Sequence, residues 1–171
     1  MNILDNTVLS NFASINQLQL LEQITNDRKT VVTNFVLKEF YGTRRHEKIK
    51  LKFDVNEIDA EDIKLFKDSL EVSSYLNLGN GEISCVLLAK SFHEHSIVFT
   101  DDKLARKYCK KLKIEVHGTV YLLAKAYCEN LLTFERAEGI LEQINEKGFW
   151  LRKTITIEKA IKKYQRKRDL R

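Results

Sequence analysis

The feature that most constrains the fold is a series of short apolar runs, each followed by a segment in which apolar residues have helical spacing. The runs cover residues 2–4, 30–33, 96–100 and 114–116. Short uninterrupted apolar runs are typical of strands buried on both faces, and such strands need helical crossovers between them. The pattern therefore predicts an α/β protein with a parallel sheet and right-handed connections.

Helical spacing is found in seven segments, which are 15–24, 35–40, 82–92, 104–112, 120–127, 134–144 and 156–170. In the third segment apolar residues occur almost all round the axis, which predicts a buried central helix. Thr133 is a candidate N-cap for segment 134–144, which is expected to end at Gly148. Residues 49–55 alternate apolar and polar, which predicts a peripheral strand or an extended loop. Because the chain of 171 residues has no proline, repeat or low-complexity stretch, we expect one domain.

Basic residues are concentrated near the C-terminal end. Residues 152–171 contain nine Lys or Arg and two acidic residues, a net charge of +7. The 151 residues before them contain 20 basic and 22 acidic residues, a net charge of −2. A near-neutral body with a basic end suggests that a polyanion is held beside a site that is itself negative. The alternative is a solvated helix without a partner.

No membrane or secretory segment is expected. No apolar run reaches the roughly 20 residues that a membrane helix needs, and the start, MNILDNTVL, has no basic stretch before an apolar one. The cysteines, Cys85, Cys109 and Cys128, are widely spaced within apolar helical patterns and form no CxxC pair. We therefore expect a cytoplasmic protein in a reducing compartment, with the cysteines as small core residues.

Acidic residues follow the predicted strands. Asp5 comes directly after the first strand, and Asp101 and Asp102 come directly after the third. Glu39 lies about one turn into the helix after the second strand, and Glu82 begins the buried helix after a Gly-Asn-Gly stretch. Because functional crevices of open parallel sheets lie beyond the carboxyl ends of the strands, these acids are expected to meet at one edge.

Each acid also has a purely structural explanation. Asp5, or Asn6 beside it, could cap the following helix, and so could either aspartate of the pair 101–102. Glu39 fits an exposed position on an amphipathic helix. Glu82 fits a first-turn acid favoured by the helix dipole.

Taken together, the acids favour a metal site, because converging carboxylates repel one another and must take up protons or a cation. Oxygen ligands suit hard cations such as Mg²⁺ or Mn²⁺. Zinc is disfavoured, since His93 and His95 would lie on different sides of a helix with no cysteine nearby. His46 and His117 show no partner pattern.

Five segments in order, LDNTVLSNFA, VLKEF, GNGEISCVLLAK, FTDDKLARKY and VHGT, resemble PIN-domain proteins. The chain is similar to the VapC-type toxin ribonucleases and in particular resembles an uncharacterised prokaryotic branch with a G-x-G-E motif, here Gly79-Asn80-Gly81-Glu82. Gly148-Phe149 resembles the Gly-Phe before that branch's final helix. The resemblance implies a PIN-like three-layer α/β/α domain over 1–150, with a mostly parallel sheet of four to five strands. It also implies a basic C-terminal helix over 151–171, packed on the domain or extending from it.

The resemblance also implies site residues. The implied catalytic and metal-binding residues are Asp5, Glu39, Glu82 and Asp102. Asp101 is a further candidate ligand, since a shift of one residue would exchange its role with that of Asp102. Asn6 and Thr100 are candidates for hydrogen bonds that orient the ligands.

The implied activity is cleavage of phosphodiester bonds in single-stranded RNA, with Mg²⁺ or Mn²⁺ activating a water. Basic residues would position the RNA backbone, or would form solvated faces. The candidates are Arg44, Arg45, Lys48, Lys103, Arg106, Lys107, Lys162, Lys163, Arg166 and Lys167.

By the same resemblance we expect a homodimer that acts as the toxin of a toxin-antitoxin pair, silenced by a small antitoxin protein. The main rival is a catalytically inactive PIN-like module that binds RNA or a protein. A haloacid-dehalogenase-type phosphohydrolase is disfavoured, because Asp5-Asn6-Thr7 lacks the second aspartate of Asp-x-Asp. A dinucleotide-binding fold is disfavoured because Gly79-x-Gly81 lacks the third glycine.

Overall fold

A five-stranded parallel sheet forms the centre of the protein. The computed structural model describes residues 1–43, 46–70, 75–92, 96–148 and 156–169, with the side chain of Lys167 left aside. Within these residues the strand order is β3-β2-β1-β4-β5, and every pairing is parallel. The strands are β1 (Asn2–Leu4), β2 (Thr30–Thr33), β3 (Asp54–Asn56), β4 (Ile97–Phe99) and β5 (Glu115–His117). The predicted α/β class with a parallel sheet is confirmed.

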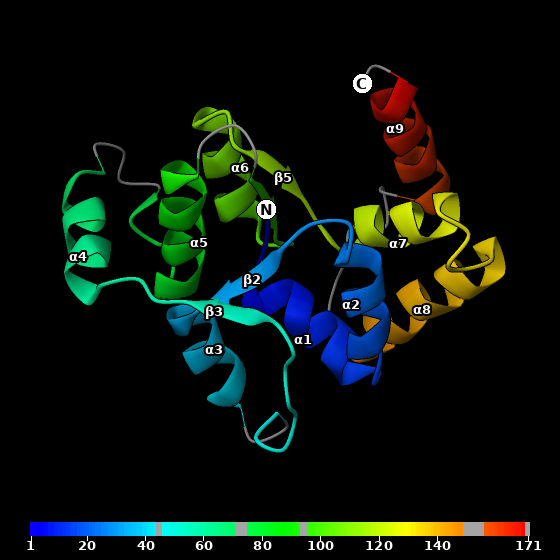
Figure 1. Cartoon of the computed structure of the whole chain (residues 1–171), viewed down its shortest axis with the longest axis horizontal. Helices are drawn as coiled ribbons and strands as arrows, with labels where there is room; N and C mark the ends of the chain where they lie inside the picture. The colour runs from blue at the N-terminus through cyan, green and yellow to red at the C-terminus, as the bar shows by residue number, and fades with distance from the viewer. Residues whose placement is uncertain (44–45, 71–74, 93–95, 149–155, 170–171) are drawn as a thin grey trace.

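Helices cover the sheet on both sides. In Figure 1, α4, α5 and α6 lie on one side of the strands, and α1, α2 and α7 lie on the other. The described helices are α1 (Asn6–Ser14), α2 (Leu18–Thr25), α3 (Asn34–Tyr41), α4 (Ala60–Asp68), α5 (Asn80–Ser91), α6 (Lys103–Lys111), α7 (Thr119–Cys128), α8 (Phe134–Glu146) and α9 (Ile157–Asp169). This is the three-layer arrangement expected of a PIN-like fold.

The α5 helix is buried on most sides, as its apolar pattern predicted. Ile83, Val86 and Leu88 are all in the core, and α5 packs against β1, β2 and β4. A helix without a polar stripe is stable in water only when neighbours cover it, so the sheet and the flanking helices fix its position. The Cys85 side chain on α5 is also buried.

Both ends of α8 form as predicted. Thr133 Oγ1 accepts a hydrogen bond from the amide of Arg136 at 3.2 Å, which caps the first turn. At the other end Gly148 has a φ of +87°, a conformation that favours glycine, and it lies two residues beyond the last helical residue.

Two predicted segments differ in extent from the structure. Of segment 15–24, residues 18–24 belong to α2 as one helix, whereas residues 15–17 lie between α1 and α2, with Asn16 at a φ of +56°. Asparagine tolerates that left-handed conformation, which breaks the helix. Of segment 49–55, only the last two residues belong to a strand, β3.

The α4 helix was not predicted. Its sequence is mostly charged, and only Ile63 and Phe66 are buried. Two apolar residues make too weak a stripe to be recognised, and α4 is fixed by packing against α5.

Strand order places a switch point at β1 and β4. From β1 the chain moves to β2 and β3 on one side, and from β4 it moves to β5 on the other. In such sheets the crevice at the reversal, beyond the carboxyl ends, is where ligands bind. Asp5 follows β1 and Thr100 follows β4, so the fold brings them together at this point.

The α9 helix docks on α7. Its apolar face is covered there, with Ile157 1% exposed and Ala160 8% exposed. Figure 1 shows α9 beside α7, at the opposite end of the molecule from α4. The Lys162, Lys163 and Arg166 side chains of α9 are exposed.

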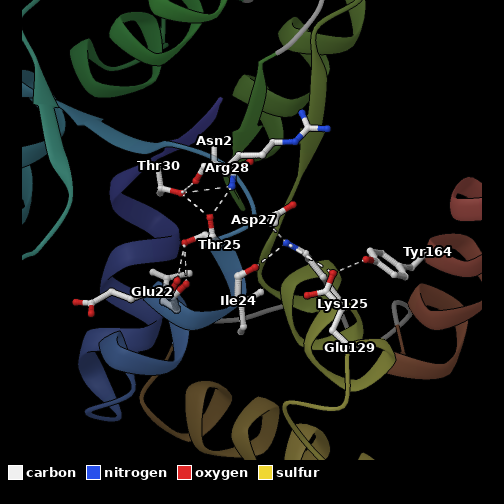
Figure 2. Close-up of polar contacts among 11 residues, drawn as sticks. Asn2, Glu22, Ile24, Thr25, Asp27, Arg28, Thr30, Lys125, Glu129 and Tyr164 are labelled. Carbon is white, nitrogen blue, oxygen red and sulfur yellow. Dashed lines mark hydrogen bonds and ion pairs between the residues drawn. The ribbon is translucent and has the colours of Figure 1, made fainter. Parts of the chain in front are cut away.

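A buried lysine ties α9 and α7 to α2. Lys125 of α7 is 6% exposed, and its Nζ donates to Ile24 O at 2.6 Å and to Asp27 Oδ1 at 2.6 Å. Glu129 Oε1 lies 3.9 Å from the same Nζ and accepts a 2.6 Å hydrogen bond from the Tyr164 hydroxyl of α9 (Figure 2). The Lys125 ammonium group is therefore bonded to the Ile24 carbonyl and lies beside the carboxylates of Asp27 and Glu129.

Candidate active site

Asp5 lies at the centre of the site and is 1% exposed. Its Oδ2 accepts hydrogen bonds from Thr7 Oγ1 and Thr100 Oγ1, both at 2.7 Å. Its Oδ1 is buried and has no hydrogen-bond partner among the described residues. Although Asp5 occupies the N-cap position of α1, its side chain makes no capping hydrogen bond. One carboxylate oxygen is thus held in place by two hydroxyls, while the other accepts no hydrogen bond from the described residues.

Burial raises the pKa of Asp5, and hydrogen bonds from Thr100 and Thr7 partly oppose that shift. The backbone amides of Asn6 and Thr7 also lower this pKa. The Asn6 side chain itself bonds within its helix, where its Oδ1 accepts from Ser10 Oγ at 3.0 Å. Desolvation of this kind disfavours a bare carboxylate and favours protonation or a cation.

Glu39 and Glu82 approach from α3 and α5. Glu39 Oε1 accepts a hydrogen bond from the amide of Gly81 at 2.9 Å, which links α3 to the first turn of α5. A Cβ atom at Gly81 would lie 2.5 Å from Glu39 Oε2, and one at Gly79 would collide with Glu82 Oε2. The two glycines therefore provide the space that both glutamates occupy.

The acids act on one another electrostatically. The pKa of Glu82 is raised to about 7, first by burial and then by the negative charge of Asp5. Glu39 and Asp102 raise the same pKa further. Burial, followed by the charge of Asp5, also raises the pKa of Glu39. The four predicted acids therefore share one negative region in which Glu82 is poised to change protonation near neutral pH.

Asp102 caps α6 with one oxygen. Its Oδ1 accepts from the amide of Ala105 at 2.7 Å, while its own amide donates to Thr100 Oγ1 at 3.1 Å. The negative charge of Asp102 also raises the pKa of Glu82. The capping explanation and the functional explanation therefore both apply to this residue.

The Asp101 carboxylate has a different set of partners, on α7 and α1. Its carboxylate accepts from the amide and the hydroxyl of Thr119 and from Asn11 Nδ2 at 2.9 Å. Burial raises the pKa of Asp101, while its hydrogen bonds to Thr119 and the charge of Arg106 lower it. Adjacent in sequence, Asp101 and Asp102 thus have different partners.

As they stand, no three His, Cys, Asp or Glu side chains of the described residues have the geometry of a metal site. The donor set is nevertheless suited to a hard cation, because it consists of carboxylates and includes a buried oxygen, Asp5 Oδ1, that has no hydrogen bond within the described part of the chain. Asp5, Glu39, Glu82 and Asp102 are the residues that could hold such an ion.

Basic side chains flank the acids on α6. Lys103 and Lys107 are exposed, and Lys107 Nζ lies 5.7 Å from the centre of the Tyr75 ring. Arg106 is partly buried, and its Nη1 donates to Thr100 O at 3.1 Å. Lys48 is exposed in the segment after α3. Arg44, Arg45 and the side chain of Lys167 lie outside the described residues, as do His93 and His95.

Residues that sequence reasoning missed complete the site. These are Thr7, Asn11, Gly118 and Thr119. Thr7 and Asn11 are four positions apart, so they share one face of a helix that starts after Asp5. That spacing could have indicated them, whereas nothing local links Thr119 to Asp101.

A groove of about 670 Å³ lies away from the acids, between α4 and α5. Its apolar lining includes Leu65, Phe66, Leu88 and Phe92, and its rim includes Glu57 and Asp62. None of the four predicted acids lines it, so it is separate from the candidate active site.

The fold and the site define an open parallel α/β protein with an acidic centre at its switch point. The chain belongs to the PIN-domain family, whose model matches residues 1–166. PIN domains are commonly nucleases, bind nucleic acid and generally use divalent metal ions, so the match supports a hydrolytic activity. Searches of curated proteins and of solved structures found no match. Among the described helices, none is long and apolar enough to cross a membrane.

Proposed function

We propose that the protein is a divalent-metal-dependent endoribonuclease that cleaves single-stranded RNA. The observation that carries the proposal is the buried Asp5, whose Oδ1 lacks a hydrogen bond among the described residues, in a region where burial and the charges of Asp5, Glu39 and Asp102 raise the pKa of Glu82. Such a group of carboxylates is stable in its ionised form when a cation neutralises it.

Asp5, Glu39, Glu82 and Asp102 would hold Mg²⁺ or Mn²⁺. The bound ion would supply a water activated for attack on the phosphodiester and would stabilise the leaving oxygen. Thr7 and Thr100 orient Asp5 through its Oδ2, which leaves Oδ1 for the ion. The Gly81 amide orients Glu39 in the same way.

The RNA backbone would lie along exposed basic residues. Lys103 and Lys107 lie on α6, which starts directly after Asp102 and so extends from the acidic centre. Lys162, Lys163 and Arg166 of α9 provide a second basic surface. Such contacts position phosphates without reading sequence. We include Lys48, Arg44, Arg45 and Lys167 in this proposal from their sequence positions.

The test is cleavage of a fluorescently labelled single-stranded RNA by the purified protein. Cleavage is expected with Mg²⁺ or Mn²⁺ and is expected to stop with chelator. Asp5→Asn and Glu82→Gln are expected to lower kcat by about 100-fold or more while the protein stays folded. Glu142→Gln, an exposed acid on α8, is the matched control and should leave the rate unchanged.

Binding of RNA without any cleavage by the wild-type protein would favour the rival, an inactive PIN-like module. Calorimetric titration with Mn²⁺ separates the two, because a nuclease centre should bind the ion and lose it in Asp5→Asn. Equal cleavage by the wild type and both variants would contradict the assignment of the acids.

The resemblance to VapC-type toxins extends the proposal to a homodimer that is the toxin of a toxin-antitoxin pair in the cytoplasm. Light scattering of the purified chain tests the dimer. Growth arrest on expression, relieved by co-expression of the adjacent reading frame, tests the toxin role.

A further inference from the structure

The α7 helix begins without a capping side chain of its own. Its N-cap residue is Gly118, so the helix lacks the side-chain oxygen that usually accepts from a first-turn amide. Asp101, which follows β4, supplies that oxygen from outside, with its Oδ1 3.1 Å and its Oδ2 3.2 Å from the amide of Thr119. A negative charge at this end of a helix is also favoured by the helix dipole.

Asp101, Asn11 and Thr119 form a polar cluster from three separate parts of the chain. Thr119 Oγ1 donates to Asp101 Oδ2 at 2.5 Å, and Asn11 Nδ2 donates to the same oxygen at 2.9 Å. Asn11 Nδ2 also lies 3.0 Å from Thr119 Oγ1. Because Asn11 is 2% exposed and Thr119 is fully buried, breaking these bonds would leave buried polar groups without partners.

Gly118 permits the close approach of the cluster. A Cβ at this position would collide with Asp101 Oδ1 and would lie 2.5 Å from Arg106 Nη1. Its φ is −137°, so space rather than backbone conformation requires glycine here. Arg106 places a positive charge beside Asp101 and lowers the pKa of that carboxyl.

The backbone of Asp101 reaches the acidic centre. Its amide donates to Thr7 Oγ1 at 3.0 Å, and the same hydroxyl donates to Asp5 Oδ2 at 2.7 Å. The next residue along the chain is Asp102. Any movement of Asp101 therefore moves Asp102 relative to Asp5.

We propose that Asp101 is a positioning residue of the proposed nuclease site and not a metal ligand. It anchors the β4–α6 loop, which carries Asp102, to Asn11 of α1 and to Thr119 of α7. The inference rests on the proposed function, because the loop matters through the acid that it carries.

The test exchanges the carboxylate of Asp101 and the side-chain amide of Asn11. Asp101→Asn removes the charge beside Thr119, and Asn11→Asp places two carboxylates face to face. The double variant D101N/N11D again has one carboxylate and one amide, at exchanged positions. An oxygen of this pair can still accept a hydrogen bond from Thr119. Mn²⁺ affinity by calorimetry, kcat and KM on single-stranded RNA, and thermal unfolding are measured for all four proteins.

Each single variant is expected to weaken Mn²⁺ binding and to lower kcat by about 10–100-fold. KM for RNA should stay within about twofold, since the Asp101 carboxylate is bonded to Thr119 and Asn11 and is not expected to contact RNA. The double variant should recover both quantities to within about threefold of wild type. A merely structural role would change the unfolding temperature without this pattern in metal affinity.

A double variant that binds Mn²⁺ no better than Asp101→Asn would overturn the proposal, because a ligand carboxylate cannot be replaced from position 11. If Asp101→Asn does not fold, Thr119→Ser and Thr119→Val test the same contact. The serine variant keeps the hydroxyl and should bind Mn²⁺ like wild type, whereas the valine variant should lose at least about tenfold in affinity. Absence of RNA cleavage by wild type would count against the proposed function alone, since the Mn²⁺ measurements do not depend on it.

Discussion

Glu39 Oε1 and the amide of Gly81 form a 2.9 Å hydrogen bond that holds the acid of α3 against the first turn of α5. Glu82 follows Gly81 directly, so this one contact, between residues 42 positions apart in the sequence, helps to position two acids that come from different helices. Gly81 has no Cβ, and this absence leaves room for the Glu39 carboxylate.

Gly81→Ala should therefore reduce activity much more than stability. The new Cβ would lie 2.5 Å from Glu39 Oε2, and the flexible glutamate would have to move away. We expect kcat to fall by about 10-fold or more, while the free energy of unfolding changes by less than about 1 kcal/mol, because alanine is a good helix former. Gly139→Ala on α8, where a Cβ would meet nothing within 4 Å, is the control and should keep full activity. Equal activity of the two variants would show that the position of Glu39 is unimportant.

Without divalent ions, stability should fall as the pH rises towards neutrality. The folded protein holds a proton on Glu82 up to a pKa of about 7, whereas the unfolded chain releases it near 4.5. Between these values the folded state binds more protons, so the free energy of unfolding decreases as the pH rises through this window. Burial also raises the pKa of Asp5, which adds to the same loss of stability with rising pH.

Thermal unfolding in chelator at pH 5 and pH 7.5 checks this. Glu82→Gln should remove part of the decrease and raise Tm at pH 7.5 by roughly 2–4 °C, which corresponds to about 1 kcal/mol. Added Mn²⁺ should raise the wild-type Tm at pH 7.5 more than at pH 5, because the ionised acids bind the ion. A Tm in chelator that rises with pH over this range would contradict the prediction.

Lys125→Met should destabilise the fold by about 1–3 kcal/mol. The substitution leaves the Ile24 carbonyl without the lysine donor and removes the partner of Asp27 (Figure 2). Denaturant unfolding measures the loss. Asp27→Asn is the matched variant and should cost less than about 1 kcal/mol, since its amide oxygen can still accept and Asp27 is about half exposed. A larger cost for Asp27→Asn than for Lys125→Met would mean that the buried carbonyl contributes little.

Neutralising α9 should weaken RNA binding and reduce its salt dependence. Lys162→Gln together with Lys163→Gln removes two exposed charges from the face of α9 that does not pack on α7. The slope of log K against log salt should become shallower by up to about 1.4 for single-stranded RNA. Lys147→Gln, an exposed lysine after α8, is the control. An unchanged slope in the double variant would make α9 a solvated helix.

The order of elements and the main acids could be predicted from local patterns. The runs at β1, β2, β4 and β5 are short and apolar, and the period of their side chains differs from that of the helices between them. A parallel sheet then brings the residues after its strands to one edge, which is why Asp5 and Asp102 could be grouped from the sequence. The α4 helix was missed because its few apolar residues carry little periodic signal.

Other features depend on contacts between distant residues, for which a sequence pattern holds no signal. Asp101 and Asp102 are chemically identical neighbours, and only the bonds from Asn11 of α1, 90 residues away, and from Thr119 of α7 show that the first is held between these two helices. Likewise Asp5 looks like a helix cap in sequence, yet its oxygen is held by Thr100.

The amino-acid sequence thus specified the α/β alternation, the basic end of the chain and which stretches carry acids, because periodicity and charge are properties of neighbouring residues. Only the folded chain decided which carboxylates lie near one another and how far burial raises their pKa values. Hydrogen bonding and desolvation depend on the whole packed surroundings of a group, and the sheet assembles those surroundings from segments that are far apart in the sequence.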